Sequence, residues 1–538
     1  MIFYMENKKI LRIAFIALLG GVLGCTDLDV TPKNAAVGDV VFTDPAAYKQ
    51  SLAKVYAGLA IGGQSSGDGN SDISGIDGGF SQYIRMYFNL QELPTDEAVI
   101  GWNDGTIQTL HFQNWTSQSE FINAMFNRVY FQVSMANEFL RQTSDDLLAA
   151  RGVTDAMKAD IKQYRAEVRF LRALSYWHGL DMFGSIPLVP ETNPIGTDAP
   201  GQPEGGKQDV FNYIESELLA AEPDLGKPKT MEYARVDQAA AWMLLAKLYL
   251  NAETYIGTKK YTESLTYVNK IIASNAYTLD PVYNNIFLAD NHKSPEIIFP
   301  VAFDGTYTKT YGGTTFLAHA SVGGDKMKPS DYGLDGGWAG LRTTANIVNL
   351  FAPADGRANF FTDGQSKEIP STPNTSFNEG YAHPKFQNVT STGSQGSNTT
   401  FADTDFPMFR LGDVYLMYAE AVLRGGSGGD AGTALGYINQ LRVRAYGNTN
   451  GNIQAGDLTL GFIIDERGRE LSWECHRRTD LVRFGLLTVN DSNDPRAIWA
   501  WKGGESAAGK QTQAFRNVFP IPSAALTANT KLEQNDGY

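Results

Sequence analysis

The sequence predicts a mainly α-helical protein: a tetratricopeptide-like helical-repeat scaffold of about four helix pairs, with an irregular loop-rich subdomain that holds a little β-structure. Apolar residues recur every three or four positions over most of the chain, and two helix pairs share one pattern. Residues 300–405 instead alternate short β-like pieces with Gly, Ser, Thr and Asn. The 538 residues are 43% hydrophobic and 19% charged, which is a globular composition.

Residues 1–24 have the pattern of a secretory signal peptide. A basic segment precedes an apolar run of 11 residues, 13–23, which is shorter than the ~20 residues that a spanning helix needs. The run ends in Val22-Leu23-Gly24-Cys25, which resembles the lipobox of bacterial lipoproteins. We therefore expect Cys25 to carry lipid, residues 25–40 to form a tether and residues 41–538 to form the folded body. An ordinary secretory signal with a chance cysteine is the alternative.

Amphipathic helices account for most of the body. Residues 121–136 carry apolar side chains at helical spacing, and a second long helix through residues 161–183 is expected to stop near Gly184. Six more helices are predicted, the last of which can be broken into two: residues 210–221, 235–252, 261–274, 411–424, 431–445 and 462–484.

Two helix pairs follow one repeat pattern. In the first pair the apolar faces hold Trp242, Leu245, Ala246 and Tyr249, then Ser264, Val268, Ile271 and Pro281. In the second they hold Tyr415, Tyr418, Ala419 and Val422, then Ala434, Ile438 and Leu441. Ala246 and Ala419 allow two helices to approach closely, and several pairs should stack because one pair cannot bury its apolar face alone. Unrelated antiparallel hairpins are the alternative.

Three segments interrupt the helical pattern: residues 61–79, 186–207 and 300–405. The third is too long for a simple connection, so we expect an irregular subdomain that carries function. Ligand-binding insertions are expected at about residues 61–118 and 300–405.

Eight segments form a recognisable set from Cys25 to the last residue. They are "CTDLDVTP", "ELPTDEAV", "AEVRFLRALSYWHGLDMFGSIPLV", "AAAWMLLAKLYL", "FRLGDVYLMYAEAVLR", "ALGYINQLRVRA", "DERGRELSWECHRRTDLVRFG" and "VFPIPSAALTANTKLEQNDGY". In these segments and their order the chain is similar to the SusD/RagB family of outer-membrane nutrient-binding lipoproteins. The resemblance implies a non-catalytic protein that captures glycan at the cell surface and passes it to a SusC-like TonB-dependent outer-membrane transporter, which it caps. Some members of the family bind peptides or other nutrients instead.

Trp102 is the strongest candidate for ligand contact. Asn103, Asp104 and Gly105 follow it, so a turn should present the large aromatic ring. Sugar rings stack their apolar faces on aromatics, while amides and carboxylates bind the hydroxyls. A tryptophan folded onto the core beside an Asx-turn is the alternative.

Further candidates lie upstream of Trp102 and in the irregular region. They are Tyr83, Arg85, Tyr307, Tyr311, Tyr332, Asp335 and Trp338. The family resemblance implies an aromatic arc, here Trp102, Trp338 and Tyr311, acting with Arg85 and Asn103.

No metal or cofactor is expected, although "DGNSDISGIDGG" superficially suggests calcium. Asp68, Asn70 and Asp72 stand at alternate positions, but an EF-hand needs Gly where Ile73 stands and Glu where Gly79 stands. A solvated loop is therefore the better interpretation, with calcium as the weaker alternative.

The charged segment "DERGRELSWECHRRTDLVRF" invites a glycosidase interpretation, because Glu466, Glu470 and Glu474 lie four residues apart. Neighbouring arginines lower carboxylate pKa values, which is the opposite of what a general acid needs. We therefore predict a structural ion-pair network, with Cys475 as a packed thiol. Two G-x-S-x-G matches, residues 63–67 and 425–429, lack the strand and helix of a nucleophile elbow.

The formal net charge of −14 and the absence of a Lys/Arg-rich run exclude a nucleic-acid partner. The predicted function is that of a lipid-anchored glycan-binding protein of the outer membrane that faces the extracellular side. The alternatives are a peptide- or other nutrient-binding protein and, less favoured, a surface glycoside hydrolase. The hydrolase would need a carboxylate pair from the irregular region, where Asp331, Asp335, Asp355 and Asp363 are available.

Overall fold

The computed structural model describes residues 41–64, 67, 69–193, 197–370, 376–488, 496, 510 and 512–538. The predicted signal peptide, the lipidation site Cys25 and the tether lie outside these residues. Internal contacts divide the chain into two units, residues 1–47 and 48–538, and the fold described below is that of the second unit. Within the described residues, no helix has both the length and the apolar character needed to cross a bilayer.

The two long helices predicted at residues 121–136 and 161–183 are present and pack together. α6 (Glu120–Gln142) packs against α8 (Asp155–Phe183). The hydroxyl of Thr154 accepts a hydrogen bond from the Met157 N–H at the start of α8, and Gly184, at φ 76°, ends that helix. Both helices and the predicted stop at Gly184 are confirmed.

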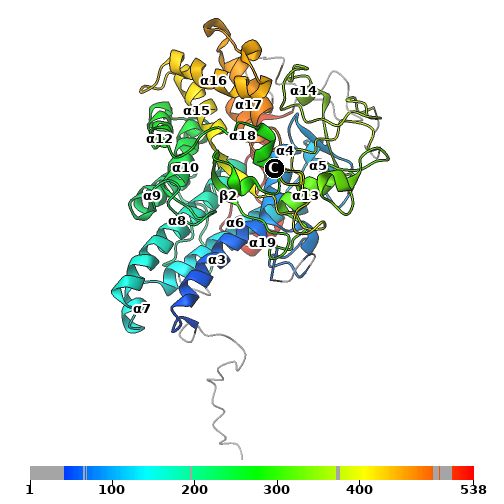
Figure 1. The fold of residues 1–538 in the computed structure, drawn as a ribbon. Coiled ribbons are helices and arrows are strands. Elements are labelled where there is room, and N and C mark those ends of the chain that lie inside the picture. Colours follow the sequence, from blue (N-terminus) through cyan, green and yellow to red (C-terminus); the bar gives the residue numbers. More distant parts are fainter. Residues whose placement is uncertain are drawn as a thin grey trace, which may run out of the picture. The chain divides into compact units, whose positions relative to one another are not determined.

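The helices that follow stack in pairs, as Figure 1 shows for α8 to α16. α8 packs on α9 (Lys207–Ala221), α10 (Gln238–Leu250) on α12 (Tyr261–Ala273), and α15 (Leu411–Leu423) on α16 (Ala431–Tyr446). The Ser264 hydroxyl donates to the backbone oxygen of Ala246 at 2.9 Å, so the small residue does permit close approach. The repeat interpretation is confirmed, except that Pro281 is exposed rather than packed.

Two small antiparallel sheets hold the irregular region. β1 (Ala98–Ile100) pairs with β3 (Leu341–Thr343), and β2 (Ile297–Val301) pairs with β4 (Phe406–Arg410). The region also contains a fully buried helix, α13 (Gly313–Ala320), that the periodicity did not predict. Its sequence GTTFLAHA has weak helix formers at its start, and packing against α4 (Tyr83–Glu92) overrides that propensity. The other helices are α3 (Ala46–Ala60), α5 (Gln108–His111), α7 (Asp145–Ala150), α11 (Ala252–Ile256), α14 (Ala345–Val348), α17 (Leu460–Leu471), α18 (Arg477–Arg483) and α19 (Ser523–Ala528).

The predicted helix over residues 462–484 is broken between α17 and α18. In the connecting turn, Trp473 (φ 60°) and Cys475 (φ 64°) adopt the left-handed conformation. The Trp473 N–H donates to the Glu97 carboxylate at 2.9 Å, and the His476 N–H donates to Glu92 at 3.2 Å. These two buried carboxyl groups hold the strained turn in place, and the thiol of Cys475 is buried, as predicted.

The predicted ion-pair network is confirmed and lies at the centre of the fold. Arg410 donates to Glu296 (2.8 Å), Glu470 (2.7 Å) and Glu474 (2.6 Å), and all four side chains are almost completely buried. Burial by itself raises the pKa of Glu466, but Arg357 at 2.9 Å and further arginines outweigh it and lower the pKa to about 2. Neighbouring arginines lower the pKa of Glu470 as well. The carboxylates of Glu466 and Glu470 are therefore held ionised and cannot act as general acids near neutral pH.

Replacement of Arg410 by alanine should destabilise the fold strongly, because it leaves three buried carboxylates without their shared cation. We expect Arg410→Ala to lower the free energy of unfolding by about 3–5 kcal/mol, measured by urea denaturation. Lys158→Ala is the control, since Lys158 forms only an exposed pair with Asp155 and should cost less than about 1 kcal/mol. Similar losses in both variants would contradict the structural role of Arg410.

Glu92 should make stability depend on pH. Burial raises the pKa of Glu92 to about 7, whereas the unfolded chain should titrate near 4.3. The folded state therefore holds this proton more tightly and loses stability as pH rises from about 4 through 7. Between pH 5.5 and pH 8.5, the free energy of unfolding measured by urea denaturation should fall in the parent. We expect this fall to be smaller by roughly 2 kcal/mol in Glu92→Gln, which lacks the titrating carboxyl group. An unchanged difference, equal to that of the exposed-site control Glu204→Gln, would contradict this assignment.

Candidate ligand-binding site

The pairing of β1 with β3 brings together two tryptophans that were predicted to contact ligand. Trp102 follows β1 and Trp338 precedes β3, and the pairing continues beyond the strands through a hydrogen bond from the Gly101 N–H to the Gly340 oxygen (2.8 Å). The indole N–H of Trp102 donates to the backbone oxygen of Trp338 at 3.1 Å. The two ring centroids lie 6.4 Å apart with 43° between the planes. The rings therefore form two facets of one curved aromatic surface.

Tyr311 supplies the third ring. Its centroid lies 6.0 Å from that of Trp338, at 56° between the planes, and 5.1 Å from that of Phe401. Trp338 is backed by the buried His319, which stacks on it with centroids 4.6 Å apart and 19° between the planes. The order along the surface is therefore Trp102, Trp338, Tyr311, and the middle ring is supported from within the protein.

Arg85 lies beneath this surface and ties its loops together. Its guanidinium donates to the backbone oxygens of Gly79 (2.7 Å) and Tyr311 (3.2 Å). The same group lies 4.4 Å from the ring centroids of both Phe80 and Phe316. Because Arg85 is only 4% exposed, its first effect is to position the loops, with a limited surface left for a ligand.

A depression of about 580 Å³ lies over these residues. It is lined by Asp77, Gly79, Phe80, Arg85, Trp102, Asp104, Tyr311 and Trp338. Five of the ten predicted contact residues are thus brought together: Arg85, Trp102, Asp104, Tyr311 and Trp338. The sequence interpretation missed Asp77, Gly79 and Phe80, although these residues end the Gly/Asp-rich segment that leads into α4.

Five predicted residues do not line the depression, and one of them, Tyr307, lines a separate groove. Tyr83 is completely buried with its hydroxyl 2.8 Å from the His178 ring, because a helix turns about 200° between Tyr83 and Arg85 and so points them to opposite sides. Asn103 is exposed beside Trp102, and Asp335 is exposed and accepts from the Thr400 hydroxyl. Tyr332 packs on the cluster around Leu334. Only the burial of Tyr83 conflicts with ligand contact, and the roles of the other nine residues stay predictions.

The calcium alternative receives no support from the geometry of Asp72. Its carboxylate pairs with Arg128 at 2.7 Å. Burial lowers the pKa of the Arg128 guanidinium, and the Asp72 carboxylate offsets part of that effect. In the described part of the chain, no three His, Cys, Asp or Glu side chains cluster in a way that could hold a metal ion, and Asp68 lies outside that part.

Comparison with known proteins decides the family. A model of the SusD family matches residues 362–538, and a model described as "Starch-binding associating with outer membrane" matches residues 83–250. The chain is 34% identical to the starch-binding protein SusD of Bacteroides thetaiotaomicron, over 99% of both chains. The chain belongs to the SusD family. It is also 24% identical to the SusD-like protein P2 of Formosa agariphila, over 98% of this chain and 99% of that one.

Solved structures share the SusD fold with this chain. Surface glycan-binding protein A from Bacteroides fluxus covers 92% of the chain with a TM-score of 0.68 and 20% identity, and 99% of that protein is matched. The Bacteroides thetaiotaomicron protein of the same name, solved with laminarihexaose, covers 91% with a TM-score of 0.66 and 19% identity, and 99% of it is matched. At these identities the likeness concerns the fold, so the mainly helical prediction is confirmed.

Gly340 should be required for the position of Trp102. A β-carbon at residue 340 would lie 2.4 Å from the Trp102 ring, which is closer than any real contact. We expect Gly340→Ala to rotate the indole and to change the near-ultraviolet circular dichroism that the Trp102–Trp338 pair produces. Gly336→Ala is the matched control, since a β-carbon there meets no atom within 4 Å. Superimposable spectra of Gly340→Ala and the parent would contradict the assignment.

Proposed function

We propose that this SusD-family protein binds glycan at the cell surface through the aromatic arc formed by Trp102, Trp338 and Tyr311. The observation that carries the proposal is the convergence of three partly exposed rings in one open depression, with centroid separations of 6.4 and 6.0 Å. Angles of 43° and 56° between neighbouring planes mean that the three rings do not lie in one plane, and together they line a depression. Such a surface suits a curved oligosaccharide better than a flat one.

Asp104 and Arg85 supply the polar part of the site. Carboxylate and guanidinium groups bind sugar hydroxyls, while the rings cover the apolar faces of the sugar. Starch-type α-glucan is the first ligand to test, because a relative of 34% identity over nearly its whole length is a starch-binding protein. A peptide or another nutrient is the alternative ligand within the family.

Delivery to a TonB-dependent outer-membrane transporter is the second part of the proposal. It is supported by membership of a family with an outer-membrane association, and by the lipobox-like segment that ends in Cys25. Lipid on Cys25 would anchor the protein, since each buried CH₂ group contributes about 0.8 kcal/mol. The binding surface would then face the medium, where polysaccharide is met.

A hydrolase is the less favoured alternative. Of the four aspartates available to it, Asp355 is buried and paired with Arg357 at 2.7 Å, so its carboxylate is engaged in structure. Asp331, Asp335 and Asp363 are exposed. We propose binding without catalysis, which release of reducing sugar from starch by the purified protein would refute.

Removal of either tryptophan should weaken glycan binding. We expect Trp102→Ala and Trp338→Ala each to reduce the affinity for maltoheptaose by about tenfold or more in isothermal titration, because each removes one stacking surface. Trp242→Ala is the control, since that half-buried indole lies on α10 and donates to Glu222 at 2.6 Å. Parent-like binding by both arc variants would show that the glycan binds elsewhere.

A further inference from the structure

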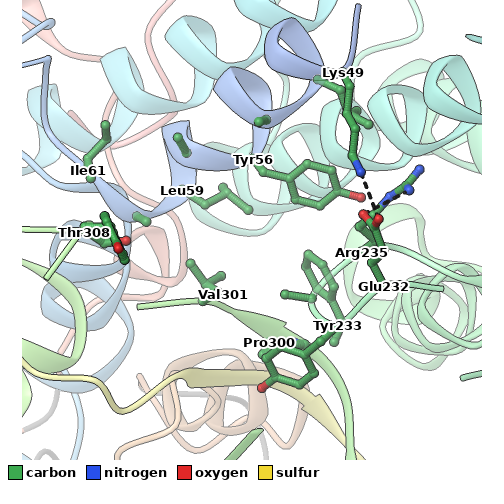
Figure 2. A pocket seen from close by; sticks show the side chains of 18 residues that line it. Lys49, Tyr56, Leu59, Ile61, Glu232, Tyr233, Arg235, Pro300, Val301 and Thr308 are labelled. Carbon is green, nitrogen blue, oxygen red and sulfur yellow. Dashed lines mark hydrogen bonds and ion pairs between the residues drawn. The ribbon is translucent and has the colours of Figure 1, made fainter. Parts of the chain in front are cut away.

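The two most exposed aromatic side chains in the described part of the chain line the same groove. Tyr307 is 88% exposed and Tyr233 is 49% exposed. The groove has a volume of about 390 Å³ and runs between α3, residues 232–235 and the end of β2 (Figure 2). It is separate from the depression over Trp102, because no residue lines both. Exposed aromatic rings around one concave surface are characteristic of a binding site.

The groove has an apolar floor and one charged end. Leu52, Leu59, Phe299 and Val301 lie among its apolar lining residues. At one end the Lys49 ammonium pairs with Glu232 at 2.8 Å, and both side chains are more than half exposed, while Arg235 points to the same carboxylate (Figure 2). At the opposite end lie Ile61 and Thr308 (Figure 2). The groove therefore offers both a stacking surface and hydrogen-bonding groups that remain open to solvent.

Four hydrogen bonds hold the turn that presents Tyr307. The Asp304 carboxylate accepts from the backbone N–H groups of Thr306 and Tyr307, both at 2.8 Å. The Thr308 N–H donates to the Asp304 backbone oxygen at 2.7 Å, and the Gly305 N–H donates to Asp403 at 2.7 Å. Because the turn is already fixed, a ligand that stacks on the Tyr307 ring has little backbone entropy to overcome.

The same two loops border the groove and the aromatic arc. Tyr307 lines the groove and Tyr311 lines the arc, and because Tyr311 is only four positions further along the chain, their Cα atoms lie at most about 14 Å apart. The other loop is the segment that follows α3. In it, Ile61 lines the groove, and the Gly67 N–H donates to the backbone oxygen of Lys309 at 2.9 Å. A polymer that leaves the arc beside Tyr311 would thus meet the groove within a few sugar units.

We propose that this groove is a second subsite for the same neutral glycan chain that binds the arc, an inference that rests on the proposed function. Its aromatic rim stacks sugar rings, and its exposed Lys49–Glu232 pair binds hydroxyls. The charged end argues against a protein partner, because Lys and Glu are depleted in protein–protein interfaces. The volume lies within the range of about 300–1,000 Å³ that small-ligand sites occupy.

The experiment compares a short with a long probe, maltotriose and soluble amylose, in isothermal titration and affinity electrophoresis. We expect Tyr307→Ala to weaken amylose binding by about three- to tenfold and to leave maltotriose binding unchanged, because only the long chain reaches both surfaces. Tyr307→Phe, which keeps the ring, should retain most of the amylose affinity. Val282→Ala, which removes an exposed apolar side chain outside both sites, should bind like the parent. Since Tyr307 is 88% exposed, its replacement should not affect folding.

Three outcomes would overturn the proposal. If Tyr307→Ala binds amylose like the parent, the groove is not a glycan subsite, although the arc still is. If that variant binds amylose normally but no longer co-purifies with an outer-membrane transporter, the groove is a protein interface. If the parent binds neither maltotriose nor amylose, the assignment of starch as the ligand of the arc is wrong, and the second-subsite proposal is wrong as well.

Discussion

The buried pairing of Arg410 with three glutamates is the interaction on which the rest of the structure depends. Arg410 is the last residue of β4 and the residue before α15, so it stands where sheet and helical scaffold meet. Its partners are Glu296, the residue before β2, Glu470 of α17, and Glu474 of the turn after α17. Arg444 of α16 pairs with Glu296 and Glu470 as well. A single buried cluster thus fixes both sheet and helices, and desolvation makes a lost partner costly.

The binding surface depends on this arrangement indirectly, through helix α4. β1 and β3 hold Trp102 and Trp338 beside each other, while α4 and α13 pack together and place Arg85 under the rings. α4 ends at Glu92, whose carboxylate holds the turn between α17 and α18. The helix that begins at the site therefore ends at the strained turn, next to the network around Arg410. A rigid scaffold and a loop-built site are thus continuous parts of one unit.

Much of the scaffold could be predicted because its signals are local. The periodic helices, the stop at Gly184 and the spacing of Glu466, Glu470 and Glu474 depend on residues a few positions apart. α13 could not be found this way, because its buried position against α4 rather than its propensity makes it helical. In the site, Trp102, Trp338, Tyr311 and Asp104 were recognisable by residue type in loops, and Arg85 by residue type in the first turn of α4. Tyr83 was misjudged because exposure depends on which face of α4 meets α8.

By itself, the sequence determined the mainly helical repeat fold, the family resemblance, the acidic net charge and the lipobox-like segment ending in Cys25. These follow from composition, periodicity and local motifs, which need no long-range information. Only the tertiary structure decided that residues 102, 311 and 338 form one surface, and that Tyr307 and Tyr233 share a second groove. The physical reason is that strand pairing and loop packing join residues that are far apart in the sequence, 236 positions in the case of Trp102 and Trp338, and no local pattern encodes such a contact.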